Sequence, residues 1–123
     1  ARCSGGKLDV IGAAAARLRD AMMAHPELVA GETRACTELM RAAPGVVLKT
    51  GAEAVFIAII PRLNLGVSVK VEDGGTRASE AVITALLIRL GVLDVAHPAA
   101  LKRLGPIQNW DGLETGRISV DLD

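Results

Sequence analysis

The residues best suited to chemistry are Lys49, Thr50 and Gly51, which follow the apolar run Val-Val-Leu at residues 46–48. Lysine rarely stays buried without a partner, so its place at the end of such a run needs an explanation. One explanation is that Lys49 ends a strand and keeps its charge in water on its own long stem. The other is that its ammonium group acts as a positioned charge or proton-transfer group. These residues alone leave both explanations open.

Cys36 and His25 also carry groups that could take part in chemistry. Cys36 shares one side of a predicted helix with Leu39 and Met40, so the default is a small buried hydrophobic residue. His25 precedes Pro26, and a residue before proline disfavours helical geometry. We therefore expect His25 to be a helix-end cap or a surface group rather than a catalytic base.

A carboxylate and a serine complete the set of candidate groups. Glu53 lies two residues beyond Gly51 and could orient Lys49 as a counter-charge, or it could cap a strand. Ser4 and Lys7 have the spacing of a Ser-x-x-Lys nucleophile motif. The two glycines between them are a poor beginning for the buried helix that this motif needs, so we expect no nucleophile at Ser4.

The composition bounds the fold and the classes of function. A chain of 123 residues, half of them hydrophobic, forms one domain with a packed core. That core must be aliphatic, because Phe56 and Trp110 are the only aromatic residues. The lack of aromatic side chains and the balance of 14 basic against 14 acidic residues argue against nucleic-acid binding. The longest nearly uncharged run, residues 54–60, is far too short to cross a membrane.

The cysteines and histidines predict neither a metal site nor a disulfide framework. Cys3, His25, Cys36 and His97 lie at none of the short spacings that bind zinc, so we expect no metal site in this chain. A single pair of cysteines in an ordinary core composition suits the reducing cytoplasm. The chain opens without an initiator methionine or a signal segment, and we interpret residues 1–123 as a single domain from the C-terminal portion of a longer protein.

Hydrophobic periodicity predicts helices on both sides of a central sheet. Apolar residues recur at three- and four-residue steps over about residues 8–25. A connector leads to a second helix over about 34–42, with Thr33 as its N-cap. A long helix over about 76–90 begins at a cap on Thr76. The apolar residues that share one face of this helix are Ala78, Ala81, Val82, Ala85, Leu86 and Leu90.

Three extended runs between these helices predict an antiparallel meander. The strands are expected at about 46–50, 53–60 and 65–72, the last with one wet face because its valines alternate with polar residues. A short connection makes the last two strands a hairpin. Beyond residue 91 we expect a loose wrapping segment with one possible edge strand at 116–120. The predicted fold class is α+β.

The Lys-Thr-Gly strand end resembles one wall of the active site in serine hydrolases of the β-lactamase and penicillin-binding type, where Ser-x-x-Lys supplies the nucleophile. Four longer stretches resemble the C-terminal half of the asparaginase II family found in Rhizobium and relatives. They are residues 21–40, 46–61, 65–93 and 109–116. The resemblance covers about residues 14–117. It implies a β-lactamase-like fold and the hydrolysis of L-asparagine to L-aspartate and ammonia.

The resemblance implies roles only for matching positions. Lys49 corresponds to the second lysine of the family's paired serine–lysine apparatus, and Thr50 and Gly51 complete the substrate-binding wall. Cys36 corresponds to a cysteine that lines the site. The family's Ser-x-x-Lys nucleophile, its second catalytic serine and its zinc ligands lie in the N-terminal half and are not matched here. The resemblance therefore implies a chain with neither its own nucleophile nor a zinc cofactor.

Three functions remain open. The first is an asparaginase-type amidohydrolase, inactive by itself, in which Lys49 acts on a serine from the missing half. The second is a truncated module without catalysis, which pairs through the edge of its sheet or through its apolar helices. The third is a related β-lactamase-like amidase that acts on glutamine or another amide. A half-domain exposes the apolar surface on which its partner packed, so we also expect self-association.

Overall fold

The computed structural model describes residues 10–123. The helices are α1 (Val10–Ala24), α2 (Pro26–Ala30), α3 (Ala35–Ala42), α4 (Thr76–Arg89) and α5 (Pro98–Leu101). The strands are β1 (Val47–Thr50), β2 (Val55–Ile60), β3 (Leu65–Lys70), β4 (Pro106–Gln108) and β5 (Glu114–Arg117), and the 3-10 turn η1 (Pro61–Leu63) joins β2 to β3. This mixture confirms the predicted α+β class.

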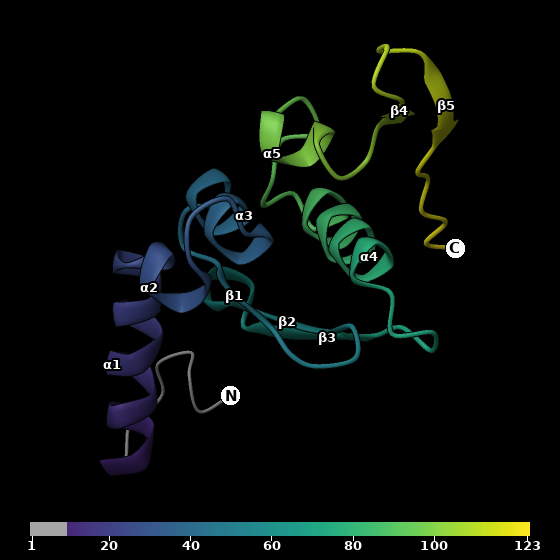
Figure 1. The fold of residues 1–123 in the computed structure, drawn as a ribbon. Coiled ribbons are helices and arrows are strands. Elements are labelled where there is room, and N and C mark those ends of the chain that lie inside the picture. Colours follow the sequence, from purple (N-terminus) through teal and green to yellow (C-terminus); the bar gives the residue numbers. More distant parts are fainter. Residues whose placement is uncertain (1–9) are drawn as a thin grey trace.

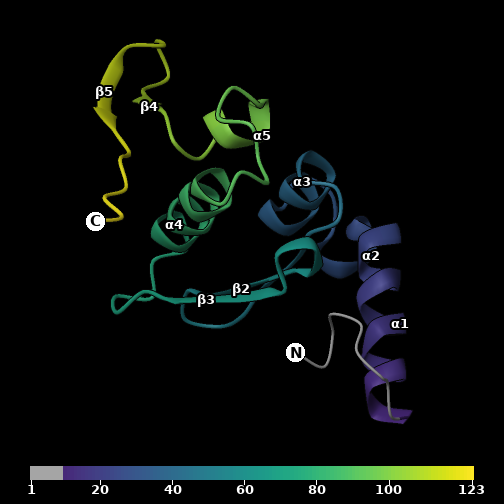
Figure 2. The same cartoon turned by 180° about the vertical axis from the view of Figure 1, so that it is seen from behind.

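The centre of the fold is an antiparallel sheet in the order β1-β2-β3, which confirms the predicted meander. Lys49 of β1 lies opposite Ile57 of β2, and Ile57 lies opposite Ser68 of β3. Helices α3 and α4 cover one face of this sheet, as the two opposite views show (Figures 1 and 2). The sheet therefore fixes the position of the Lys-Thr-Gly segment, which lies at the end of its edge strand β1.

The hydrophobic core fills the space between that face and the two helices. Side chains alternate along β2, so Phe56 points into the core with 1% exposure, whereas Ile57 points to the other face with 40% exposure. The largest fully buried hydrophobic side chains of the core are Phe56, Leu39, Leu48, Ile60, Ile83 and Leu87.

The turn between β1 and β2 differs from the prediction. Glu53 and Ala54 have left-handed backbones with φ of 52° and 57°, which no strand residue adopts. The N–H of Gly51 donates to the carbonyl of Val55 at 2.8 Å and closes the turn. The strand predicted from residue 53 therefore begins at Val55, because residues 51–54 reverse the chain.

The helix starts also differ from the prediction. Thr33 has a left-handed φ of 64°, so it cannot take the extended geometry of an N-cap, and Arg34 occupies that position. Thr76 is already helical, and Gly75 precedes α4 as its N-cap. Neither helix has a side-chain cap, but the Asp73 carboxylate accepts the Gly75 N–H at 2.7 Å and fixes the entry to α4.

The first helix is confirmed over residues 10–24, but the expected connector after it is the short helix α2. Pro26 is tolerated at its start because the first N–H groups of a helix have no intrahelical partner. The Thr37 hydroxyl of α3 donates to the carbonyls of Pro26 at 3.1 Å and Gly31 at 2.6 Å. This buried hydroxyl fixes α2 against α3.

The buried surface of α4 coincides only in part with the predicted face, since Val82, Leu86 and Leu90 of that face pack against the core but are only partly buried. Its fully buried residues are Ser79, Ala81, Ile83, Thr84 and Leu87, and only Ala81 belongs to the predicted face. The two polar residues can be buried because their hydroxyls bond within the helix, Ser79 to the Thr76 carbonyl at 3.0 Å and Thr84 to the Glu80 carbonyl at 2.6 Å. A hydrophobicity pattern does not show this compensation.

The segment after residue 91 is more ordered than expected. His97 caps α5 by accepting the Ala99 N–H on its Nδ1 atom at 3.1 Å. A small sheet of β4 and β5 follows, with β5 at 114–117 where an edge strand was predicted at 116–120. This hairpin stands apart from the main sheet (Figure 1). Its tip carries Trp110, which is fully exposed at 105%.

A buried arginine connects three helical segments. Arg103, only 5% exposed, lies with its Nη2 2.6 Å from Glu38 of α3 and its Nε 3.5 Å from Glu80 of α4. Lys102 approaches the same Glu38 carboxylate at 2.8 Å. Burial alone would raise the pKa of Glu38, but the hydrogen bonds from Lys102 and Arg103 outweigh it and hold that pKa below its ordinary value. The cluster therefore holds α3, which carries Cys36, against the rest of the fold.

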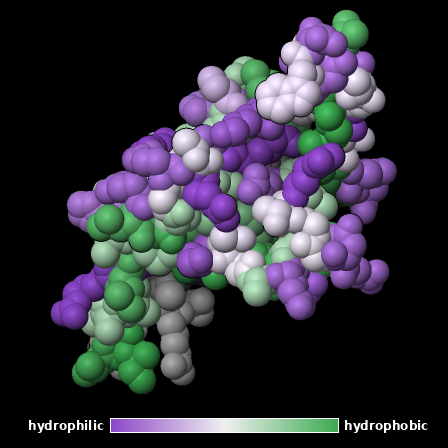
Figure 3. Space-filling model, viewed as in Figure 1, coloured by the Kyte–Doolittle hydropathy of each residue, from purple (hydrophilic) through white to green (hydrophobic). Residues whose placement is uncertain are grey.

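Apolar side chains are exposed along α1. Val10, Ile11 and Leu18 of this helix all lie on the surface. Figure 3 shows hydrophobic residues gathered over α1 at the lower left of the molecule. Within residues 10–123, no helix combines the length and the apolar composition needed to cross a bilayer.

Candidate active site

The backbone of β1 presents Thr50 at the free edge of the sheet. Gly51 donates its N–H to Val55 of β2, so Gly51 faces β2. In an antiparallel strand the N–H and C=O of successive residues point to opposite sides. The backbone groups of Thr50 therefore point away from β2, toward the edge that no other strand of the described chain covers.

Two side chains occupy these outward backbone groups. The Thr50 N–H donates to the Cys36 Sγ at 3.2 Å, and the Lys49 ammonium donates to the Thr50 carbonyl at 2.7 Å. The Thr50 hydroxyl lies 3.4 Å from the Val55 carbonyl oxygen and 3.5 Å from the Gly51 carbonyl oxygen. Both distances are too long for a strong hydroxyl hydrogen bond. The structure thus brings Lys49, Thr50 and Cys36 together and leaves the hydroxyl loosely held.

The Cys36 thiol is buried and unreactive by environment. Its residue is 1% exposed, and burial raises the pKa of the thiol, although the Thr50 N–H and the Lys49 charge act in the opposite direction. A protonated, inaccessible thiol is a poor nucleophile. The sulfur accepts the Thr50 N–H, so the observed role of Cys36 is to hold that amide in place.

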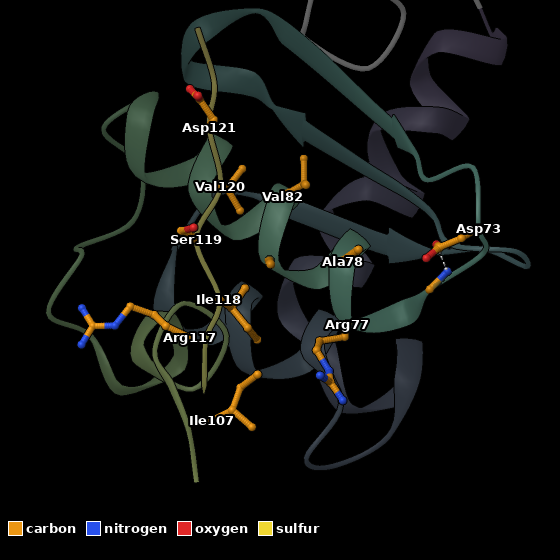
Figure 4. Close-up of a pocket in the computed structure, with 12 residues that line it drawn as sticks. Asp73, Arg77, Ala78, Val82, Ile107, Arg117, Ile118, Ser119, Val120 and Asp121 are labelled. Carbon is orange, nitrogen blue, oxygen red and sulfur yellow. Dashed lines mark hydrogen bonds between the residues drawn. The ribbon is translucent and has the colours of Figure 1, made fainter. Parts of the chain in front are cut away.

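The site lies at an open strand edge rather than in an enclosed pocket. A cavity of about 730 Å³ lies between α4 and the segment after β5, where Ala78 and Val82 face Ile118 and Val120 (Figure 4). Two smaller cavities of about 310 and 370 Å³ lie near α5 and between α1 and α3. Lys49, Thr50, Gly51 and Cys36 line none of these three cavities.

The sequence matches the L-asparaginase II family over residues 3–120. The match covers nearly the whole chain, including β1 and its Lys-Thr-Gly end. The chain belongs to the L-asparaginase II family. A separate comparison with curated proteins found no match.

Membership of the asparaginase II family supports an asparaginase-type function with an amide substrate such as asparagine. The match begins nearer the N-terminus than the resemblance at residue 14, and it includes Ser4–Lys7. Those residues lie outside the part of the chain that the structure describes.

The other candidate groups do not join Lys49 in this asparaginase II chain. Glu53 lies in the turn and forms no ion pair with Lys49, whose ammonium bonds to the strand's own carbonyl. His25 occupies the N-cap position of α2 without capping it, and its Nδ1 lies 3.6 Å from Glu27 on the surface. This position agrees with the predicted surface role.

The described residues of the asparaginase II chain do not fit a zinc ion. No three His, Cys, Asp or Glu side chains among residues 10–123 lie close enough together to hold a metal. Cys36, the cysteine of this region, uses its sulfur as the acceptor for Thr50. We assign no metal to these residues.

Sequence patterns missed one group of this candidate site, the backbone amide of Thr50 that points away from β2. The alternation of backbone groups along a strand would have indicated the direction of this amide if the sequence had shown that residues 51–54 form the turn. The Arg103–Glu38 ion pair, which holds α3 in place, leaves no local sequence pattern, because the two residues lie 65 positions apart in the chain.

The burial of Cys36 predicts slow chemical labelling. In a Cys3→Ser background, we expect a soluble maleimide to modify Cys36 at least about tenfold more slowly in the native chain than in denaturant. A Thr115→Cys variant in a chain that also carries Cys36→Ala provides an exposed control, which should react at similar rates in both conditions. Rapid native labelling of Cys36, measured by mass spectrometry, would show that the sulfur is open to solvent.

Proposed function

We propose that this chain supplies the Lys-Thr-Gly wall of an asparaginase that hydrolyses L-asparagine to L-aspartate and ammonia. One observation carries the proposal: the Lys49 ammonium and the outward amide of Thr50 lie together at the free edge of β1. If Lys49 releases the Thr50 carbonyl, that strand-edge carbonyl can hydrogen-bond an extended ligand. An ammonium beside them can hold a carboxylate or stabilise negative charge that develops on the substrate.

Each residue of the wall has a distinct proposed role. Lys49 would exchange its bond to the Thr50 carbonyl for contact with the nucleophile or the substrate. The loosely held Thr50 hydroxyl would bind a polar substrate group. Gly51 keeps the strand end narrow, because a Cβ there would lie 3.3 Å from the Cβ of Val55. We propose Cys36 as a positioning residue, since its thiol holds the Thr50 amide.

Amide hydrolysis also needs a nucleophile, and we propose that a Ser-x-x-Lys segment outside residues 10–123 provides it. The proposed chemistry uses no metal ligand from the described residues. We place the chain in the reducing cytoplasm, because its buried Cys36 is a free thiol.

The activity of the isolated chain tests whether the nucleophile lies outside residues 10–123. We expect the purified 123-residue chain to release no ammonia from L-asparagine, measured by a coupled ammonia assay. Activity that disappears in a Ser4→Ala variant would contradict this result and would identify Ser4 as the nucleophile. Activity that survives Ser4→Ala would place the nucleophile elsewhere in the chain.

A second candidate function is an association module without catalysis, and the exposed apolar residues of α1 favour it. Val10, Ile11 and Leu18 contribute apolar surface that a lone soluble domain seldom leaves uncovered. We propose that the chain self-associates, whether or not it also catalyses. Turnover that depends on Lys49 would distinguish the enzyme from the module.

A further inference from the structure

Arg103 contacts both of the helices that cover the sheet. It follows α5, which lies beyond α3 and α4 on the side away from the sheet in both views (Figures 1 and 2). Its side chain is only 4% exposed, and each of its three guanidinium nitrogens lies near an acceptor. Nη1 donates to the Ala99 carbonyl at 2.8 Å and Nη2 donates to Glu38 of α3 at 2.6 Å. Nε lies 3.5 Å from Glu80 of α4.

The contact of Arg103 with α3 is the stronger of the two helix contacts. The bond from Nη2 to Glu38 is short and charge-assisted, whereas the buried Nε makes no hydrogen bond with any of residues 10–123. Lys102 also bonds to the Glu38 carboxylate at 2.8 Å, but its side chain is 55% exposed and water weakens that contact. Arg103 therefore fixes α3 more firmly than it fixes α4.

Glu38 and Cys36 lie on opposite sides of α3. Successive residues of an α-helix are turned by about 100°, so residues two positions apart point about 200° away from each other. Cys36 faces β1, where its sulfur accepts the Thr50 N–H at 3.2 Å. Arg103 therefore contacts α3 from the side away from β1 and fixes the helix at the distance from the strand that the sulfur contact requires.

The sulfur contact is too weak to fix α3 by itself. Sulfur is a poor hydrogen-bond acceptor, so the Thr50–Cys36 bond forms only where other contacts hold the helix in place. Leu39 and Met40 of α3 pack in the core, but hydrophobic contacts are not directional and tolerate small shifts of a helix. The short, directed hydrogen bonds of Arg103 supply the direction that these contacts lack.

We propose that Arg103 is a positioning residue for the Lys-Thr-Gly wall, which acts through Glu38, α3 and Cys36 on the Thr50 amide. The inference rests on the proposed asparaginase function, because it assigns one more residue to the same site. A shift of α3 would release the Thr50 amide, and the Lys49 ammonium bonds to the carbonyl of that same residue. Arg103 reaches the substrate only through the helix.

An arginine suits this position better than a lysine does. The guanidinium group is planar and rigid, so it bonds to a carboxylate and to a backbone carbonyl at the same time in fixed directions. A lysine carries one nitrogen on a flexible stem and cannot keep the bonds to Glu38 and to the Ala99 carbonyl in this geometry. Arg103→Lys therefore keeps the buried positive charge and removes its fixed direction.

Amide hydrogen exchange in the 123-residue chain, followed for each residue by NMR, tests this positioning. In Arg103→Lys we expect the Thr50 N–H to exchange about tenfold faster or more, because its acceptor moves away. The Gly51 N–H is the internal reference, since it bonds to the Val55 carbonyl at 2.8 Å and not to α3. Its exchange rate should change by less than about twofold.

Two glutamine variants and a double variant separate positioning from general stability. Glu38→Gln removes the charge that Arg103 binds on α3 and should reproduce the selective increase at Thr50, even if Arg103→Lys does not fold. Glu80→Gln removes the same charge from α4, which does not carry Cys36, and should leave Thr50 unchanged. In Cys36→Ala the Thr50 amide has already lost its acceptor, so Arg103→Lys should add nothing to its exchange rate.

Hydrolysis of L-asparagine gives a second measurement, in a protein that joins this chain to a Ser-x-x-Lys segment of the family. We expect Arg103→Lys to lower kcat about tenfold and to change KM by less than about threefold, because the same groups are present but misaligned. The loss should vanish in the Cys36→Ala background, where the amide is no longer held.

Four outcomes decide between this inference and its alternatives. Equal acceleration of Thr50 and Gly51 would show that Arg103 only stabilises the fold and would overturn the inference. Additive effects of Arg103→Lys and Cys36→Ala would overturn the path through the sulfur. An unchanged kcat in Arg103→Lys, where Lys49→Met lowers it, would overturn the effect on hydrolysis. An unchanged rate in Lys49→Met would instead contradict the proposed function, and exchange at Thr50 would still decide the role of Arg103.

Discussion

Replacement of Lys49 by methionine is expected to lower the rate of L-asparagine hydrolysis by ~10²-fold or more, the scale of losing a positioned proton-transfer group. The measurement uses a protein that joins this chain to a Ser-x-x-Lys segment of the family. Methionine keeps the length of the apolar stem and removes the ammonium that bonds to the Thr50 carbonyl. Little stability should be lost, because the side chain is exposed.

Lys70→Met is the matched control for this experiment. Lys70 is also an exposed strand lysine, and its ammonium bonds to the carbonyl of the next residue, Val71, at 2.6 Å. Its removal should leave the rate within a few-fold of wild type. Equal small effects of both replacements would mean that Lys49 is only a solvated strand end, and the catalytic proposal would then be wrong.

Replacement of Phe56 by alanine is expected to cost about 3–5 kcal/mol of unfolding free energy, as for other large-to-small core changes. Phe56 is 1% exposed and packs in the cluster beneath α3 and α4. It is the only phenylalanine of a chain without tyrosine, so the aliphatic core has no other ring to fill the space. A loss of this size is a large part of a typical domain's stability of about 5–15 kcal/mol.

Urea unfolding followed by circular dichroism measures this loss, and Ile57→Ala is the control. Ile57 is the next residue in β2, but its side chain points to the opposite face and is 40% exposed. We expect its replacement to cost roughly 1 kcal/mol or less. Similar costs for the two variants would contradict the assignment of the covered face.

The sheet was predictable because local patterns encode it. The alternation of Val67 and Val69 with polar neighbours gave one strand, and the short connection at residues 61–64 gave its hairpin. Helix caps were less predictable, since the left-handed backbone of Thr33 depends on how α2 packs on α3. The intrinsic preference of threonine for a cap does not determine the path of the preceding turn.

The strand-end position of Lys-Thr-Gly was predictable from the sequence, but the geometry of the candidate site was not. Lys-Thr-Gly stands at the end of a strand as expected, and Cys36 lies beside it. Periodicity could place Cys36 on the inner side of its helix, but it could not show that the sulfur accepts the Thr50 N–H. That contact joins residues 14 positions apart in the chain, and only the packing of α3 on β1 creates it.

The fully exposed Trp110 determines which spectroscopic signals this protein can give. It is the only tryptophan, and it stands at the tip of the β4–β5 hairpin, in a turn where the Asn109 side chain accepts two backbone N–H groups. Its indole is already surrounded by water in the folded chain, so its fluorescence emission should change little when the core unfolds. The same property makes it a sensitive reporter of anything that covers the hairpin tip, because contact would move the emission to shorter wavelength.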